Sequence, residues 1–345
     1  MAFPKSLLRK ISPCGLLVAA AFAIAAPVRA QDSGERFPRL EAEIDIEIQD
    51  DWTFESDDPA AELNDLFTTT EPALALYLLP GLSIQSGLVL EPVRDPDPGD
   101  DRYFGDHGLF AEQLYLLYEQ DWFSLHGGKF NLPFGVAWDL APGLYGTDIA
   151  EAFYEQVERI GIGGTLHFGG DAGIGGPGFG AHSLSVQSFF LDTSFLSESF
   201  GTNRGRTKLS DGGVSNTEDF SSFAVSLDGG GFADLPIDLN YHLGLAYQDG
   251  GAGATDDELG FAAALYGAIE LADDLTLEPI VEYVHFENAG GVRQDRDIFT
   301  AGASLVQGPW NLALSYSGVR SDPSGALADR DVDQIQISAG HAFDF

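Results

Sequence analysis

The feature that most constrains this chain is a strict alternation of apolar and polar residues. It is unbroken over residues 40–48, where Leu, Ala and Ile at the even positions alternate with Glu41, Glu43, Asp45 and Glu47. A period of two is typical of a β-strand, because successive side chains point to opposite faces of the sheet. The same pattern returns at 237–247, 259–271, 299–305 and 310–316. The sequence therefore predicts an all-β fold.

We predict about 14 strands, within a range of roughly 12 to 16 if a hairpin is split or merged. They are expected at 37–49, 67–79, 82–93, 109–119, 122–130, 157–168, 181–192, 219–228, 236–249, 258–271, 274–288, 296–307, 309–319 and 332–345. The connections at 79–82, 120–121, 272–274 and 308 are tight, whereas those at 50–66, 94–108, 131–156, 193–218, 250–257, 288–295 and 320–331 are long and polar. Two Gly-rich connections, 169–180 and 229–235, are exceptions on the short side. An even strand number places both ends on the side of the short turns, as bacterial barrels require.

The second face of these strands separates two kinds of β fold. A soluble sandwich covers its outer face with Lys, Thr and Glu, but here that face is small and polar, and Lys is scarce. Aromatic residues near the strand ends, with short turns on one side and long loops on the other, are typical of transmembrane β-barrels. A sheet in lipid must close, because lipid cannot satisfy open backbone groups. We therefore predict a transmembrane antiparallel β-barrel, and favour it over a soluble sandwich or solenoid.

Residues 1–30 have the organisation of a secretory signal peptide. Lys5, Arg9 and Lys10 form a basic start, the apolar stretch 15–27 is too short to span a membrane, and 28–30 offers a cleavage site before Gln31. The only cysteine, Cys14, lies in this leader, so we expect no disulfides in the mature chain. The barrel is expected to occupy residues 31–345.

The charge of the chain excludes one large class of partners. The sequence carries 17 Lys and Arg against 54 Asp and Glu. Four of the basic residues lie in the predicted leader, which leaves 13 and a net charge of about −41 in the mature chain. Nucleic acid requires a basic footprint on its protein partner, so we expect no nucleic-acid binding.

One motif points to a known family. Glu112 and Tyr115, followed by Gly128, Lys129, Phe130, Pro133, Phe134 and Gly135, resemble the segment E-x-x-Y … G-K/Q-F-x-x-P-F-G of the phosphate-selective porin O/P superfamily and its siderophore-porin relatives. The resemblance implies an outer-membrane porin. It also implies that the third long external loop, here 131–156, folds into the pore and narrows it.

Two interpretations of this loop are open. Its charged residues are Asp139, Asp148, Glu151 and Glu155, while Lys129 and Arg159 stand in the flanking strands. Acids on the loop that face bases on the wall would set up a transverse field across a narrow pore constriction. Alternatively, the two bases pair with loop carboxylates and only pin the loop to the wall. The two interpretations are compatible.

The expected pore wall departs from the family. Phosphate-selective members line the path with basic residues, whereas the first strand here offers Glu41, Glu43, Asp45 and Glu47. Phosphate selectivity therefore does not carry over, and we expect a preference for cations.

The chain ends on an alternating stretch whose last residue is Phe345. This ending resembles the signal that outer-membrane proteins present to their assembly machinery, so Phe345 is the expected assembly signal. An ordinary edge strand is the alternative.

No catalytic arrangement is recognisable in the sequence. The seven histidines show no H-x-x-H or H-E-x-x-H spacing, no G-x-S-x-G elbow is present, and the Gly-rich stretch 169–180 lacks the Lys-Ser/Thr of a phosphate loop. We expect neither an enzyme nor a cofactor or metal centre. The acidic clusters 55–58 and 95–101 could bind a divalent cation, but solvated acidic loops are the simpler explanation.

These observations predict a porin in the outer membrane of a Gram-negative bacterium, through which small hydrophilic solutes diffuse passively. A substrate-specific uptake channel or receptor of the siderophore-porin type, or a non-conducting structural barrel, is the alternative. The expected partners are outer-membrane lipid, the barrel assembly machinery, small solutes or ions and, as one candidate oligomeric state, two further copies in a homotrimer.

Overall fold

Strands form along almost every stretch where the sequence alternates. The computed structural model describes residues 36–52, 63–140, 148–170, 179–232, 235, 237–323 and 332–341. The predicted leader, the acidic cluster 55–58 and Phe345 lie outside these ranges. The strands are β1 (Arg39–Trp52), β2 (Asn64–Leu79), β3 (Leu82–Pro92), β4 (Arg102–Tyr103), β5 (His107–Gln120), β6 (Phe123–Phe130), β7 (Arg159–Gly169), β8 (Ala181–Leu191), β9 (Phe200–Gly201), β10 (Ser222–Gly230), β11 (Asp238–Gln248), β12 (Glu258–Ala272), β13 (Leu275–Glu287), β14 (Gln294–Gln307), β15 (Trp310–Pro323) and β16 (Val332–His341).

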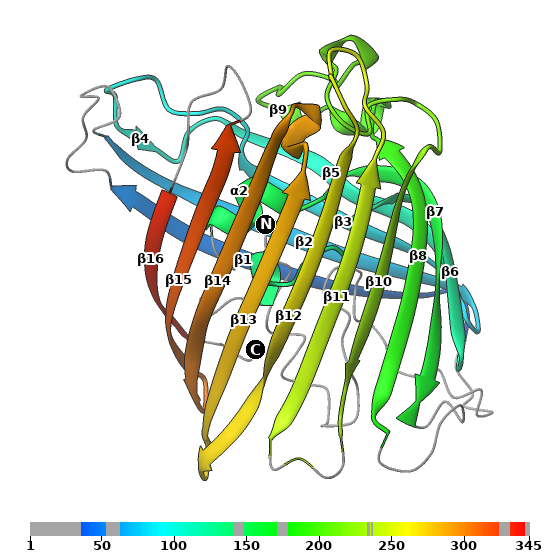
Figure 1. Ribbon diagram of the computed structural model, residues 1–345, viewed down its shortest axis with the longest axis vertical. Coiled ribbons are helices and arrows are strands. Elements are labelled where there is room, and N and C mark those ends of the chain that lie inside the picture. The colour runs from blue at the N-terminus through cyan, green and yellow to red at the C-terminus, as the bar shows by residue number, and fades with distance from the viewer. Residues whose placement is uncertain are drawn as a thin grey trace.

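All of these strands belong to one sheet (Figure 1). Its hydrogen-bonded path follows the chain order from β1 to β16 and leaves out only β4, which pairs with β2, and β9, which pairs with β5. Each neighbouring pair on the path is antiparallel. The prediction of about 14 strands differs from the 16 observed, and the difference is the two-residue strands β4 and β9. Such short strands have no alternation from which they could be predicted.

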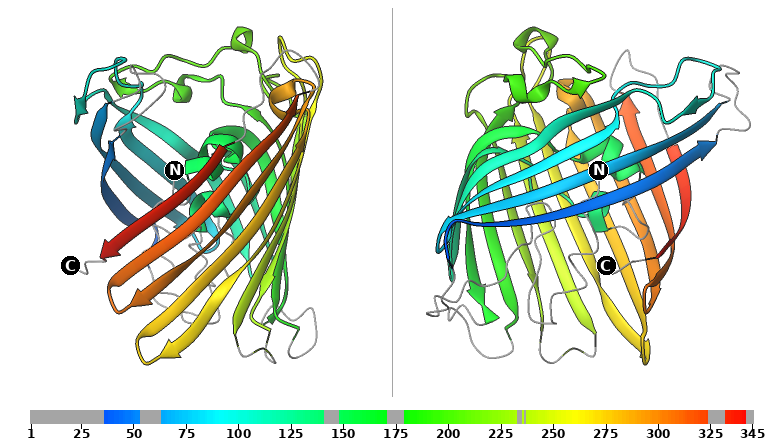
Figure 2. Two further views of the ribbon diagram at one scale, coloured as in Figure 1. Left: turned by 60° about the vertical axis from the view of Figure 1, so that its left-hand side comes forward. Right: turned by 180° about the vertical axis from the view of Figure 1, so that it is seen from behind.

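The sheet curls around an interior (Figure 2). Between the described residues of β1 and β16 no ladder of hydrogen bonds is present, so these two strands are the edges of the curled sheet. The start of β1 and the end of β16 lie beside the tight turns, because Arg39 pairs with Tyr77 and His341 with Trp310. The even number of strands on the path thus places both ends of the sheet on the side of the tight turns, as the sequence predicted.

The two faces of the sheet are inverted relative to those of a water-soluble protein. The outward face is apolar, with Ile162 59% and Leu314 55% exposed, whereas Ser315 on the inward face is 2% exposed. Other inward positions also carry buried polar side chains, among them Gln85, Gln113, Ser185, Gln187, Ser226, Thr300 and Ser317. This agrees with the alternation in the sequence, because Leu312 and Ile46, at apolar positions of the pattern, are exposed outward and Ser315, at a polar position, is not.

The tight turns depend on residues that accept a left-handed backbone. Gly81, between β2 and β3, has φ +76°, and a Cβ there would lie 2.6 Å from the carbonyl oxygen of Glu119. Asp274, between β12 and β13, has φ 60°, a conformation that Asp tolerates better than most residues.

The two described α-helices are short and lie inside the sheet, whereas three 3-10 turns, Phe195–Ser197, Leu209–Asp211 and Ala289–Gly291, belong to connections between strands. Helices α1 (Ala137–Leu140) and α2 (Asp148–Tyr154) belong to the connection between β6 and β7, and Figure 2 shows both within the curl. Neither is long and apolar enough to cross a membrane.

The exit of the chain from β6 into the interior depends on Gly128. This residue has φ +142°, and a Cβ would lie 2.5 Å from the Leu114 carbonyl oxygen and 2.7 Å from the Tyr115 Cα. We predict that Gly128→Ala lowers the free energy of unfolding by about 1–3 kcal/mol, measured by urea titration in detergent micelles. Gly127→Ala is the matched control, since its Cβ would meet the nearest atom, Ile162 Cγ2, at 3.4 Å. Equal stability of the two variants would contradict this assignment.

Candidate functional site

After β6 the chain leaves the wall and enters the interior, and we call the described parts of this connection, 131–140 and 148–156, the inward segment. Leu132, Phe134, Val136 and Trp138 on its outgoing arm are buried, as is Tyr154 on its returning arm. The Leu132 N–H donates to the Gln156 carbonyl at 2.9 Å, which joins the two arms at the wall. The described parts of the loop, 131–140 and 148–156, therefore lie in the interior, whereas residues 141–147 lie outside the described part of the chain.

Small residues on the far wall make room for the inward segment. The Phe134 ring lies 5.5 Å from that of Phe286 on β13. A Cβ on Gly260 would come within 2.7 Å of both rings, and one on Gly244 would lie 3.3 Å from Phe134. Ala246, Ala262 and Ala264 belong to the same buried cluster. The small inward faces of β11 and β12 thus form the surface on which the inward segment packs.

Polar groups on the same wall bind the backbone of the outgoing arm. The Glu282 carboxylate on β13 accepts from the Val136 N–H at 2.6 Å and from the Ala137 N–H at 3.0 Å. His242 Nε2 on β11 accepts from the Gly135 N–H at 3.1 Å. All three N–H groups are buried, so each needs a partner of this kind.

The returning arm reaches the same carboxylate. The Tyr154 hydroxyl donates to Glu282. Burial, together with the negative charge of Glu282, raises the pKa of the Tyr154 phenol. The phenol therefore keeps its proton and acts as the donor.

Lys129 was predicted to stand at the constriction, and the structure corrects this. It shares the outward strand face with Leu125 and with its cross-strand partner Leu114, both exposed. It is 1% exposed and pairs with Glu158 and Asp192, each at 2.7 Å. Its described ion-pair partners lie outside the inward segment, so the predicted pairing with loop carboxylates is wrong for Lys129.

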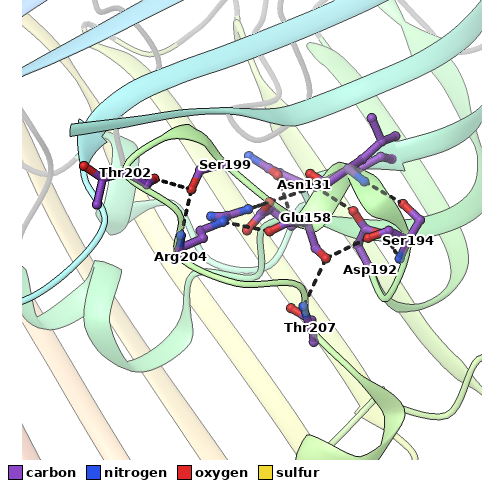
Figure 3. Close-up of polar contacts among 11 residues, drawn as sticks. Asn131, Glu158, Asp192, Ser194, Ser199, Thr202, Arg204 and Thr207 are labelled. Atoms are coloured by element: carbon purple, nitrogen blue, oxygen red, sulfur yellow. Dashed lines mark hydrogen bonds and ion pairs between the residues drawn. The ribbon is translucent and has the colours of Figure 1, made fainter. Parts of the chain in front are cut away.

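The reason lies in a gap that the inward segment leaves in the wall. β6 pairs only with residues 114–120 of β5. Nearer the start of β5, at Gly108 and Leu109, β9 is the pairing partner in place of β6. The connection that carries β9 binds there through Arg204, which pairs with Glu158 (Figure 3). The Arg204 guanidinium also stacks 3.7 Å from the centre of the Phe110 ring. The Glu158 N–H also donates to Asn131 Oδ1 at 3.1 Å, where the inward segment begins. Lys129 is buried because this connection fills the gap.

Arg159, the second predicted base, does lie on the inward face, opposite Phe130. Glu258 on β12 interacts electrostatically with it and with Arg296 on β14. The Arg296 guanidinium stacks 4.8 Å from the ring centre of Phe153 in the inward segment. The two wall bases, Arg159 and Arg296, therefore interact with the wall carboxylate of Glu258, and Arg296 also contacts the inward segment through the Phe153 ring.

The predicted acids of the segment are in different environments. Asp139 is buried and Glu155 is half-buried. The side chains of Asp148 and Glu151 lie outside the described part of the chain. The role of these four carboxylates at a constriction stays a prediction.

The predicted acidic row of β1 is partly visible. Glu41 and Glu43 pair with Ala75 and Ala73, which are buried on the inward face of β2. The backbone register places Asp45 opposite Glu71 and Glu47 opposite Thr69. Arg39, at the start of the row, pairs with Glu41 at 3.3 Å and stacks over Tyr77.

The motif residues gather where the inward segment departs. Tyr115 packs edge-on against Phe130 with ring centres 6.5 Å apart, and its backbone faces Gly128. Glu112 is buried beside Asn131. Gly135, with φ +72°, lies against Tyr154, where a Cβ would come within 2.5 Å of the ring. These residues form the base and first turn of the inward segment, together with Pro133, which precedes Phe134.

Sequence reasoning missed Glu282, His242 and Asp228. One signal was present for Glu282, an acid that stands among the apolar Ile280, Val284 and Phe286 on its strand face. His242 was noted only as one of several scattered histidines. Nothing in the local sequence indicates that either residue faces Gly135–Ala137.

No protein family and no curated protein matches the sequence. Among solved structures, the outer membrane channel DcaP of Acinetobacter baumannii is similar at a TM-score of 0.46 and 13% identity, over 82% of this chain and 80% of that one. OmpT of Vibrio cholerae, in-vitro folded, is similar at a TM-score of 0.41 and 11% identity, over 88% and 95%, and its trimer form at 0.40 and 11%, over 86% and 97%. All three TM-scores lie below 0.5, so the likeness carries no conclusion about function. The resemblance to the porin O/P superfamily stays a likeness of one motif.

The placement of Lys129 can be tested by stability. We predict that Lys129→Met lowers the free energy of unfolding by about 3–5 kcal/mol, because Asp192 and Glu158 would lose a buried counter-charge. Loss of β-type circular dichroism with urea measures this. Lys208→Met is the control, since Lys208 is exposed. If both variants unfold at the same urea concentration, Lys129 does not hold this network together.

Proposed function

We propose that this protein is a passive diffusion channel for small hydrophilic solutes in the outer membrane of a Gram-negative bacterium. The observation that carries the proposal is the inverted sheet, with Leu, Ile, Val and aromatic side chains outward and Gln, Ser, Thr and charged side chains inward. Such a surface is unfavourable in water but suits lipid, where each strand must satisfy its backbone through its neighbours. Closure of the sheet between β1 and β16 belongs to this proposal.

The inward polar side chains support a hydrated interior. Several of their buried atoms have no protein hydrogen-bond partner, among them Gln85 Oε1, Gln187 Oε1, Gln248 Oε1 and both amide atoms of Gln113. Leaving a buried polar atom unsatisfied costs about 1–3 kcal/mol. Water in the interior would satisfy these atoms. A water-filled interior narrowed by the inward segment would pass only small solutes.

The charges on the inward face support a preference for cations. Among the described strand residues, the basic side chains on this face are Arg39, Arg102, Arg159 and Arg296. Each of them has an acidic neighbour, which is Glu41, Asp65 or Glu258. Acidic side chains on the same face are more numerous and include Glu41, Glu43, Glu71, Glu119, Asp228, Glu258, Glu270, Glu278 and Glu282. A low-dielectric wall around a narrow aqueous path strengthens the effect of such charges on ions.

Ion selectivity in planar lipid bilayers tests the proposed function. We predict channel conductance with a reversal potential that favours K⁺ over Cl⁻ in a salt gradient. The preference should weaken towards 1 M salt, where the Debye length falls to about 3 Å. Glu41→Gln combined with Glu43→Gln should reduce it, whereas Asp100→Asn combined with Asp101→Asn, in an exposed loop, should not. No conductance would indicate a structural barrel, and preference for Cl⁻ would contradict the proposed selectivity.

The membrane location can be tested with neighbouring residues of β16. Ile337 is exposed outward, and Gln336, which pairs with Ser315, lies on the inward face. Ile337→Arg should reduce the free energy of folding into lipid vesicles by about 2–4 kcal/mol, because a charge would enter the hydrocarbon region. Gln336→Arg should cost much less. Equal costs would show that the outward face is not in lipid.

A further inference from the structure

One carboxylate and one imidazole of the wall accept hydrogen bonds from three consecutive backbone N–H groups of the inward segment. These are the N–H groups of Gly135, Val136 and Ala137, bound by His242 and Glu282. We infer that Glu282 and His242 position the inward segment across the interior and thereby set the width of the channel. The effect on channel width rests on the proposed function. The positioning contacts themselves do not depend on whether the protein conducts ions.

Glu282 binds both arms of the segment with one carboxylate. Oε2 accepts from Val136, while Oε1 accepts from Ala137 and from the Tyr154 hydroxyl. Glu282 is 1% exposed, so these donors replace the water that its charge would otherwise bind. An ionised carboxylate accepts at both oxygens, whereas an amide in its place would present an NH₂ group to donors.

His242 is held in one tautomer by its own partner. Nε2 accepts from the Gly135 N–H, so this nitrogen carries no proton. The proton is therefore on Nδ1, which donates to Asp228 Oδ1 at 2.6 Å. The other oxygen of Asp228 accepts from Ser226 Oγ at 3.1 Å. Asp228 thus acts through His242, because it fixes the ring that binds Gly135.

The contacts lie far from the point where the segment leaves the wall. The segment departs from β6, whereas His242 and Glu282 stand on β11 and β13, with β7, β8 and β10 between β6 and β11 in the sheet. At the β6 end, the arms are joined by the Leu132–Gln156 hydrogen bond. The segment is therefore fixed at its base and at its far side. Loss of the far contacts would remove the hydrogen bonds that Gly135, Val136 and Ala137 make with the far wall, while packing such as that of Phe134 on Phe286 would remain.

Thiol accessibility at position 136 tests this inference. The only native cysteine is Cys14, so Val136→Cys introduces a single reactive site into the chain from Gln31 onward. Val136 is fully buried and binds Glu282 through its backbone, which the substitution keeps. We expect slow reaction with a small water-soluble thiol reagent in the otherwise native protein. Glu282→Gln should speed the reaction roughly tenfold or more, the scale of losing charge-assisted hydrogen bonds.

Control variants separate positioning from general damage. Glu119→Gln removes another inward carboxylate, half-buried beside the tight turn between β5 and β6, and should leave the reaction rate unchanged. Glu282→Asp keeps the charge and should restore part of the protection. If Glu282→Gln does not fold, His242→Gln replaces it, because that change removes fewer contacts. Unchanged reactivity of the thiol at position 136 in whichever of these two variants folds would overturn the inference.

Bilayer recordings of the same variants connect the contacts to the channel. Glu282→Gln should alter the single-channel conductance and increase open-state noise, while Glu119→Gln should not increase the noise. Faster labelling without current in any variant would reject the proposed function and leave the positioning role intact. Normal current with unchanged labelling would reject the positioning role alone.

Discussion

The backbone hydrogen bonding of the sheet is the constraint on which the rest of this structure depends. Each strand on the path from β1 to β16 forms backbone hydrogen bonds with its neighbours. The side chains are therefore not needed as hydrogen-bond partners for the N–H and C=O groups of the strands. This frees the outward face to be apolar and the inward face to be polar. The alternation in the sequence has its physical meaning here, because one residue of slippage would exchange the two faces.

The inward segment breaks this arrangement and creates two requirements. Where the chain leaves the wall after Phe130, β5 loses its partner, and β9 with Arg204 restores pairing and charge balance there. Within the interior, the backbone N–H groups of the segment have no strand beside them, and Glu282 and His242 accept from three of them. Buried charges that look unusual in isolation, such as Lys129 and Glu282, are thus consequences of one departure from the sheet.

The sequence predicted the strands well because the alternation is a local property. The pattern at 310–316, for example, identifies both the strand β15 and its outward face. The motif around Phe134 also predicted an inward segment. The partners of that segment could not be predicted, because the contact of Val136 with Glu282 joins residues that are distant along the chain and depends on how far the sheet curls. Lys129 was misplaced for the same reason, since its burial depends on residues that follow β8.

The central claim is that the inward face meets water and the outward face meets lipid. Single cysteines in place of Glu43 and Ile44, on adjacent positions of β1, test it directly in reconstituted vesicles. Glu43 shares its face with buried Ala73, and Ile44 is 59% exposed on the outer face. A membrane-impermeant thiol reagent should label the cysteine at position 43 and spare the one at position 44. Equal labelling of both positions, or labelling of position 44 alone, would contradict the account.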